Sequence, residues 1–326
     1  MAITVNLPSN TTNSSLTLGN KNYKLIGGSN NVDDTLIVGD GIDKLIGGDN
    51  NTGGSVTLGS GDDTVIGGNF NTDVTITLGN GNDVFKSGNN NTGSNITLGT
   101  GTDTIYNGDN NTLATLTVGQ VGKGFLTFYD VGSNNTFDTQ HFNGTVVEYI
   151  DGGNNNTNNT TFFGNGNVTM IFKSGGMGDS ADNVFAGNGN DILLLAPNSQ
   201  LIAGNGLDKV HANQNDTITL GNGNDTVHAG PNDTISLGTG VDTIVFAVSP
   251  YPTFIGQETI SGFSPQHDVI KINHTLIGSF SGGGHTVLAD AHQVGLDTVI
   301  TIDASNAITL TGVALSSLHA HNFLFV

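Results

Sequence analysis

The fold is decided by residues 56–75, which read VTLGSGDDTVIGGNFNTDVT, and by residues 76–95, which read ITLGNGNDVFKSGNNNTGSN. Both stretches carry a strand-like tetrad, a Gly-x-Gly-x-Asp turn and an Asn-Thr pair at the same offsets. The tetrad recurs with a period of twenty at 16–19, 36–39, 56–59, 76–79, 96–99 and 116–119. Such a repeat indicates a solenoid, whose units bury their apolar side only by stacking on their neighbours.

Apolar and polar residues alternate in two short runs of each repeat. Ile76 lies between Thr75 and Thr77, and after the Asp turn a second run, residues 84–86, has Phe85 at its centre. A period of two is typical of strands with one buried face. The sequence therefore predicts an all-β protein, a right-handed parallel β-solenoid of the β-roll or β-helix type with two strands in each coil.

The second turn of each repeat carries asparagine at a constant phase. The positions are Asn31, Asn51, Asn71, Asn91 and Asn111. Stacked asparagines can exchange side-chain amide hydrogen bonds along the axis of a solenoid, and they suit turns. We expect a structural Asn ladder here rather than a binding site.

A second series of turns has a period of seventeen. Its loops are Gly187–Asp191, Gly204–Asp208, Gly221–Asp225 and Gly238–Asp242, and Asp216 and Asp233 recur on the opposite edge. After residue 247 the repeat is lost, but strand-like runs remain at 268–272, 297–302 and 307–311. We predict a solenoid of 20-residue coils (1–119), irregular coils (120–175), 17-residue coils (176–246), and a β-rich cap that includes a secretion signal (247–326).

The turns are suited to a hard cation. Glycines can direct backbone carbonyl oxygens inward, and each Asp adds a carboxylate, which is the ligand chemistry of calcium. Coils stack about 4.8 Å apart, so aspartates in register would repel one another without a cation. The alternative is that these aspartates only cap turns through local hydrogen bonds. The predicted calcium ligands are Asp43, Asp63, Asp83, Asp103, Asp182, Asp191, Asp208, Asp216, Asp225, Asp233, Asp242, and Gly187, Gly189, Gly204, Gly206, Gly221, Gly223, Gly238 and Gly240.

Residues 186–194 (AGNGNDILL) and 220–228 (LGNGNDTVH) resemble the nonapeptide repeats of the RTX, or hemolysin-type, calcium-binding family. The resemblance implies calcium between successive loops, folding at extracellular calcium concentrations, and bacterial type I export without a cleaved signal peptide. The tail, residues 315–326, is similar to the C-terminal export signals of that family. The sequence departs from the family pattern where Leu-Gly or Ala-Gly replaces the leading Gly-Gly, and the 20-residue coils lack a second Asp loop.

Composition narrows the possible partners. The chain has 28 acidic and 8 basic residues, a net charge of −20, no arginine and no cysteine. This charge repels phosphate backbones and anionic lipids, so we expect neither nucleic-acid binding nor membrane insertion. The absence of cysteine excludes disulfides and thiolate metal sites. Residues 1–6 contain no basic n-region, and no cleaved signal peptide is expected.

The main functional hypothesis is a secreted calcium-binding structural protein of the cell surface or extracellular matrix. Unpaired strand edges at the ends of a solenoid favour self-association into a surface layer, filament or adhesin, with cell-surface glycans as further partners. Two alternatives stay open: an ice-binding solenoid that uses outward Thr columns (Ser55, Thr57, Thr75, Thr77, Asn95, Thr97, Thr115 and Thr117) and a polysaccharide-acting β-helix enzyme. We expect no catalysis, because the repeat already uses most of the Asp residues. His211 and His228 share a phase and should stack on an outer face.

Overall fold

The computed structural model describes residues 1–119, 126–130, 133–143, 146–151, 157–158, 160–172, 183–246, 254–276 and 284–326. The chain divides into two compact units, Met1–Ser180 and Ala181–Val326. The predicted all-β solenoid of parallel stacked coils is confirmed in its fold class. Among the described residues, helix is limited to α1 (Gly284–Ala289) and to the 3-10 turns η1 (His274–Leu276), η2 (Leu315–Ser317) and η3 (Ala320–Asn322).

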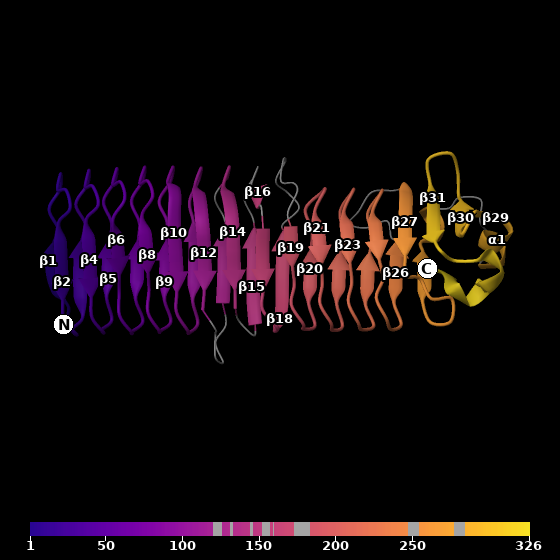
Figure 1. The fold of residues 1–326 in the computed structure, drawn as a ribbon, viewed down its shortest axis with the longest axis horizontal. Helices are drawn as coiled ribbons and strands as arrows, with labels where there is room; N and C mark the ends of the chain where they lie inside the picture. The colour runs from indigo at the N-terminus through magenta and orange to yellow at the C-terminus, as the bar shows by residue number, and fades with distance from the viewer. Residues whose placement is uncertain are drawn as a thin grey trace. The chain divides into compact units, whose positions relative to one another are not determined.

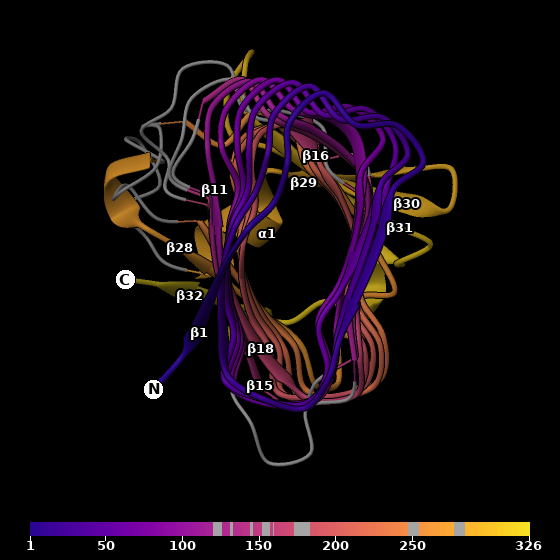
Figure 2. The same ribbon diagram turned by 90° about the vertical axis from the view of Figure 1, so that its left-hand side faces the viewer.

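The first unit consists of two parallel sheets, one on each side of the coil (Figures 1 and 2). One sheet runs β1 (Ile3–Asn6), β3 (Tyr23–Ile26), β5 (Lys44–Ile46), β7 (Thr64–Ile66), β9 (Val84–Lys86), β11 (Thr104–Asn107), β13 (Leu126–Asp130), β15 (Val146–Asp151) and β18 (Asn167–Phe172). The other contains β2 (Ser15–Leu18), β4 (Thr35–Val38), β6 (Ser55–Thr57), β8 (Thr75–Thr77), β10 (Thr92–Leu98), β12 (Thr112–Val118), β14 (Thr136–Phe142), β16 (Thr157–Asn158) and β17 (Thr160–Phe163).

The twenty-residue period of the sequence is the strand register of this unit up to β11 and β12, beyond which the offsets change to between 21 and 24. Each residue of β5 pairs with the residue twenty positions later in β7, for example Leu45 with Val65. Equivalent inward positions therefore form continuous apolar columns. One column is Leu25, Leu45, Val65, Phe85 and Ile105, all at most 5% exposed. Because successive strand residues point to opposite faces, the intervening Thr and Lys side chains face outward.

The second unit repeats this plan with a register of seventeen up to Phe246, and with offsets of 25 and 26 to the strands that follow. One sheet runs β20 (Ile192–Leu194), β22 (Lys209–His211), β24 (Thr226–His228), β26 (Thr243–Phe246), β28 (Val269–Ile272) and β32 (Phe323–Phe325). The other contains β19 (Asn183–Phe185), β21 (Gln200–Ile202), β23 (Thr217–Thr219), β25 (Thr234–Ser236), β27 (Gln257–Ser261), β31 (Ala307–Thr311), β30 (Asp297–Thr301) and β29 (Ala291–Val294). The core columns are Val184, Leu201, Ile218, Ile235 and Ile260, and Leu193, Val210, Val227, Ile244 and Ile270, each at most 1% exposed.

The cap closes the second unit by extending both of its sheets. Strand β31 pairs in parallel with β27, and β32 pairs in parallel with β28. Strand β30 then pairs antiparallel with β31, and β29 pairs antiparallel with β30, which ends the regular repeat (Figure 1, yellow). The strands that we expected at 268–272, 297–302 and 307–311 are present as β28, β30 and β31. This end of the second unit is therefore covered by the β-rich segment that the sequence led us to expect as a cap.

No helix in the described part of the chain is long and apolar enough to cross a bilayer.

Candidate metal-binding loops

The Asp residues of the Gly-x-Gly-x-Asp loops form two buried columns, one in each unit. The first is Asp43, Asp63, Asp83 and Asp103, and the second is Asp191, Asp208, Asp225 and Asp242, all at most 2% exposed. In seven of these residues, Oδ1 accepts a hydrogen bond from the equivalent backbone N–H of the preceding coil. Asp43 N–H donates to Asp63 at 2.8 Å, and Asp208 N–H donates to Asp225 at 2.8 Å. The coils are thus joined through one oxygen of each carboxylate.

The second oxygen of seven of these carboxylates has no such donor. The Oδ2 atoms of Asp63, Asp83, Asp208, Asp225 and Asp242 are buried and lack a hydrogen-bond partner in the described structure, as are those of Asp43 and Asp103. A buried carboxylate oxygen without a donor or cation is costly, and native proteins rarely contain one. Seven such atoms recur at equivalent positions of two columns, so they are a property of the repeat rather than an isolated defect.

The two glycines of each loop are required by the stacking itself. A Cβ on Gly206 would lie 1.5 Å from the Gly189 carbonyl oxygen, and a Cβ on Gly223 would lie 1.6 Å from that of Gly206. The same hypothetical Cβ on Gly223 would also lie 3.0 Å from Oδ1 of Asp225. The glycines therefore leave an open cradle of carbonyl oxygens beside the carboxylate. The loops of the first unit are alike, since a Cβ on Gly81 would lie 1.9 Å from the Gly61 carbonyl oxygen.

Burial makes the charged form of these carboxylates unfavourable. It raises the pKa of Asp63 and Asp83 to about 7, with a further contribution from neighbouring aspartates. Burial likewise raises the pKa of Asp208, Asp225 and Asp242 to about 6. A cation shared by adjacent loops would reverse both effects, because it compensates for the lost hydration and for the like-charge repulsion.

The donor set fits calcium in its chemistry. Oxygen atoms from carboxylates and backbone carbonyls are the ligands of calcium, and the loops offer both. Among the described residues, no group of three or more His, Cys, Asp or Glu side chains is placed to hold a metal ion. A site here would therefore consist of two aspartates from adjacent coils, with the remaining ligands supplied by glycine-loop carbonyls.

The aspartates on the opposite edge of the second unit are different. Asp216 accepts from Ser199 N–H at 2.8 Å and from Asn213 N–H at 2.7 Å, one bond to each oxygen. Asp233 likewise accepts from Asp216 N–H and Gly230 N–H, both at 2.8 Å. Both carboxylates are satisfied by the turns in which they lie. This geometry matches the turn-capping alternative, so Asp216 and Asp233 are weaker calcium candidates than the predicted set implied.

Two acidic residues that sequence reasoning overlooked extend these columns. Asp268 accepts from Asp242 N–H at 2.9 Å and from Ser264 N–H at 2.7 Å, and so ends the first-edge column. Glu258 accepts from Asn232 N–H at 2.6 Å and from Asp233 N–H at 3.2 Å. The signal for Asp268 was an Asp directly before an apolar strand, which persists although the glycines are lost. Asp182 lies outside the described residues.

The Asn ladder exists, but its hydrogen bonds differ from those expected. Oδ1 of Asn51, Asn71, Asn91 and Asn111 each accepts from the backbone N–H of the preceding asparagine at 2.8 to 2.9 Å. Asn135 continues the ladder by accepting from Asn111 N–H at 2.8 Å. Amide-to-amide bonds occur instead in outer columns, as from Asn222 to Asn205 at 2.6 Å. The inner ladder is therefore the neutral counterpart of the Asp column.

Two surface patterns in the sequence are also present in the structure. His211 and His228 stack with ring centroids 4.4 Å apart, and burial lowers the pKa of both. The predicted Thr columns are in register, since Ser55 pairs with Thr75 and Thr57 pairs with Thr77.

No protein-family model matches the chain, and no curated protein sequence matches it either.

Proposed function

We propose that this protein is a secreted calcium-binding structural protein of the cell surface or extracellular matrix, related to the RTX family, that folds when calcium is bound. The proposal rests on one observation: each Asp column leaves a series of buried Oδ2 atoms without a hydrogen-bond donor. Asp208, Asp225 and the glycine carbonyls of their loops would hold an ion between two coils. Bound calcium supplies positive charge, which permits the buried carboxylates to remain ionised.

Folding and calcium binding are coupled in this proposal. An unfolded chain does not bring aspartates seventeen or twenty residues apart into contact, so the site exists only in the stacked coil. Any ligand that binds only the folded state stabilises it by mass action. A low-calcium compartment would then contain an unstable chain that can be exported, and an extracellular medium would stabilise it.

Self-association is the structural half of the proposal. In the described part of the first unit, β1 and β2 each pair with a strand on one side only, namely β3 and β4. Exposed parallel edges of this kind can accept another chain. We propose no catalytic role, because the aspartates of the loops are held in the stacking network.

Calcium titration of the chelator-treated protein tests the proposal. Circular dichroism would follow folding and light scattering would follow assembly, from chelator to about 10 mM calcium, with magnesium in parallel. We expect the β signal to rise with calcium and to respond less to magnesium, which demands a stricter octahedral shell. Added scattering would support a calcium-triggered assembly, and β signal alone would support a monomeric binder. A calcium-independent spectrum and melting curve would refute the calcium proposal.

The in-register Thr columns support one further candidate, an ice-binding face. Outward residues of β6, β8, β10 and β12 repeat along the strand and between coils at the regular spacings of a sheet. Inhibition of ice recrystallisation by the wild type, lost on replacement of Thr77 by Tyr, would favour this function. Ile37 interrupts the array one coil before Thr57, and this interruption argues against it.

A further inference from the structure

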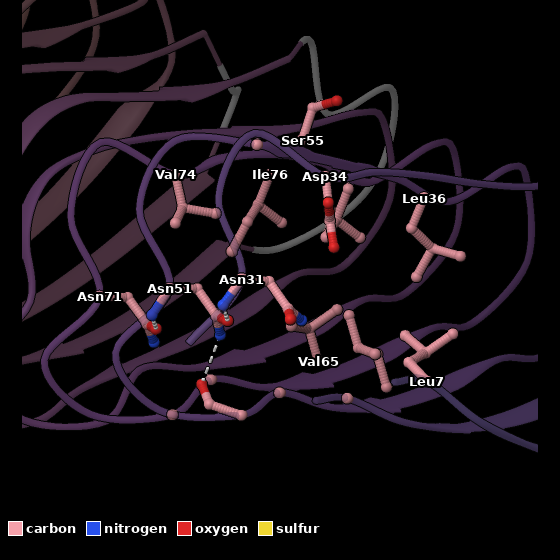
Figure 3. Close-up of a pocket in the computed structure, with 18 of the residues that line it drawn as sticks. Leu7, Asn31, Asp34, Leu36, Asn51, Ser55, Val65, Asn71, Val74 and Ile76 are labelled. Carbon is pink, nitrogen blue, oxygen red and sulfur yellow. Dashed lines mark hydrogen bonds between the residues drawn. The ribbon is translucent and has the colours of Figure 1, made fainter. Parts of the chain in front are cut away.

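The first unit contains a cavity that is separate from the Asp column. It has a volume of about 390 Å³ and lies between the sheets, beside the Asn ladder, over coils that run from Leu7 to Leu113. Its walls are inward aliphatic side chains together with paired glycines (Figure 3). Asp43, Asp63, Asp83 and Asp103 are not among the lining residues. The cavity therefore requires an explanation other than calcium.

Glycines at two adjacent positions of the coil create this space. The two columns are Gly27, Gly47 and Gly67, and Gly28, Gly48 and Gly68. In the next two coils the first glycine column continues as Ser87 and Asn107. Their side chains occupy the space that the glycines leave empty in the earlier coils. Ser94, Ile96 and Leu113 at this end are buried, whereas Leu7 and Leu16 in the first coil are partly exposed. The cavity is thus open at the first coil and blind at the other end.

The length of the cavity indicates which class of ligand would fit it. From Leu16 to Ile96 the cavity passes five coils, which is about 19 Å at about 4.8 Å per step. One extended hydrocarbon chain can lie along a space of this length, whereas a compact ring system would fill only part of it. The volume itself lies in the range of small-molecule sites.

The chemistry of the walls also selects the ligand. Figure 3 shows Leu36, Val65 and Ile76 around the cavity. Polar side chains of the lining include Asn51 and Asp34, which are engaged in hydrogen bonds: Nδ2 of Asn51 donates to the Gly48 carbonyl at 2.9 Å, and Oδ1 of Asp34 accepts from Ser14 N–H at 2.8 Å. An aliphatic void of this kind stays dry and takes up apolar molecules. A net charge of −20 disfavours a fatty-acid anion.

We propose that the interior of the first unit is a binding site for one unbranched, uncharged aliphatic chain, such as a long-chain alcohol, which enters lengthwise from the first coil. Val56 supports access to the interior. It lies in an inward column between Leu36 and Ile76, which are at most 9% exposed, yet Val56 itself remains partly exposed. Solvent therefore reaches the interior position that the chain would occupy.

Titration calorimetry of the full chain in calcium-containing buffer tests the proposal, with 1-octanol, 1-decanol, decanoate and 1-adamantanol as probes. We expect decanol to bind more tightly than octanol by about threefold to fourfold per methylene, because each added CH₂ is buried. Decanoate should bind at least about tenfold more weakly than decanol, and adamantanol should bind more weakly than decanol, because it fills only part of the length of the cavity. Equal binding of adamantanol, or no binding of either linear alcohol, would overturn the proposal.

The Gly67→Leu variant places the ligand inside the cavity. A Cβ on Gly67 would have its nearest neighbour at 3.4 Å, an ordinary contact, so the added side chain can enter the void without displacing backbone. Decanol binding should fall at least about tenfold while the melting temperature is maintained. Gly19→Leu is the matched control, because a Cβ there meets nothing within 4 Å and Gly19 does not line the cavity.

A second variant covers the case in which Gly67→Leu does not fold. Gly67→Ser copies the residue that the same column carries at Ser87, and it narrows the cavity without a large side chain. Decanol should then lose more affinity than octanol, because the shorter chain can stop before the narrowed coil. Unchanged decanol binding in a folded Gly67 variant would show that the alcohol binds elsewhere, and would refute the site.

Discussion

Replacement of Asp225 by Asn should have opposite effects on stability in chelator and in calcium. The amide oxygen of Asn can still accept the 2.8 Å hydrogen bond from Asp208 N–H, but the buried charge and the second carboxylate oxygen are lost. If Asp225 only caps a turn, this change is neutral or favourable under every condition. If Asp225 is a calcium ligand, the change is favourable only without calcium.

The gain in chelator follows from the shifted pKa. Burial raises the pKa of Asp225 from 3.8 to about 6. The shift corresponds to about 3 kcal/mol of penalty for the ionised form at neutral pH, which we reduce to about 1 to 2 kcal/mol because the loops lie at a solvated edge. The melting temperature of the Asn variant should therefore rise by about 3 to 6 °C in chelator.

The loss in calcium follows from ligand linkage. At about 10 mM calcium and a Kd of about 0.1 to 1 mM, each site adds about 1.4 to 2.7 kcal/mol to folding. Asp225 lies between Asp208 and Asp242 and would contribute to two sites, so the loss is about 3 to 5 kcal/mol and roughly 10 °C. Differential scanning calorimetry in both buffers measures the two shifts. Asp290→Asn, the same change at an exposed residue outside the loops, is the control.

The prediction is refuted if the Asn variant melts at or above the wild-type temperature in calcium as well as in chelator. Such a result would leave the aspartates as turn caps, and the orphaned oxygens would need another explanation.

Three further predictions concern the rest of the fold. Asn71→Ala removes the acceptor of the 2.8 Å bond from Asn51 N–H, and urea unfolding should show a loss of about 1 to 3 kcal/mol, whereas Thr75→Ala on the outer face should cost much less. Gly223→Ala would place a Cβ 1.6 Å from the Gly206 carbonyl oxygen, so the variant should yield little folded protein by circular dichroism, in contrast to Gly67→Ala. In chelator, the melting temperature should fall as pH rises from 5 to 9. Burial raises the pKa of Asp216, Asp233 and Glu258 to about 8, 7 and 9, so the native state binds more protons than the unfolded state over this range. Glu258→Gln should flatten the upper part of this profile, and a melting temperature that rises with pH would contradict the prediction.

The repeat made most of the architecture predictable, because a residue and its partner one period away must pair in a stacked coil. Leu45 and Val65 were expected to share a column, and Asp208 and Asp225 were expected to stack, on spacing alone. The state of the second-edge aspartates was not predictable in this way. Whether Asp216 keeps an open oxygen depends on where Asn213 N–H points, and that is a property of turn geometry.

The remaining features depend on packing between residues with no common period. Glu258 joins the column of Asp233 through a coil of 25 residues, and this offset matches neither the period of twenty nor the period of seventeen. The internal cavity arises because Gly67 faces aliphatic side chains of ordinary size across the coil, so its volume depends on both walls together. Sequence periodicity reports which residues stack along the axis, but it carries little information on how well the two walls fill the space between them.

The cap favours unfolding of the second unit from the end opposite to it. Strands β31 and β32 hold the last coil on both sheets, so amides near β27 and β28 are released only after this anchor detaches. Stacked repeats open unit by unit, at a cost set by the contacts between neighbouring units. The hydrogen-exchange rate of the backbone amides should therefore decrease progressively from β21 toward β27. Coils of nearly identical sequence would thus differ in the exchange rate of their amides according to their distance from the cap.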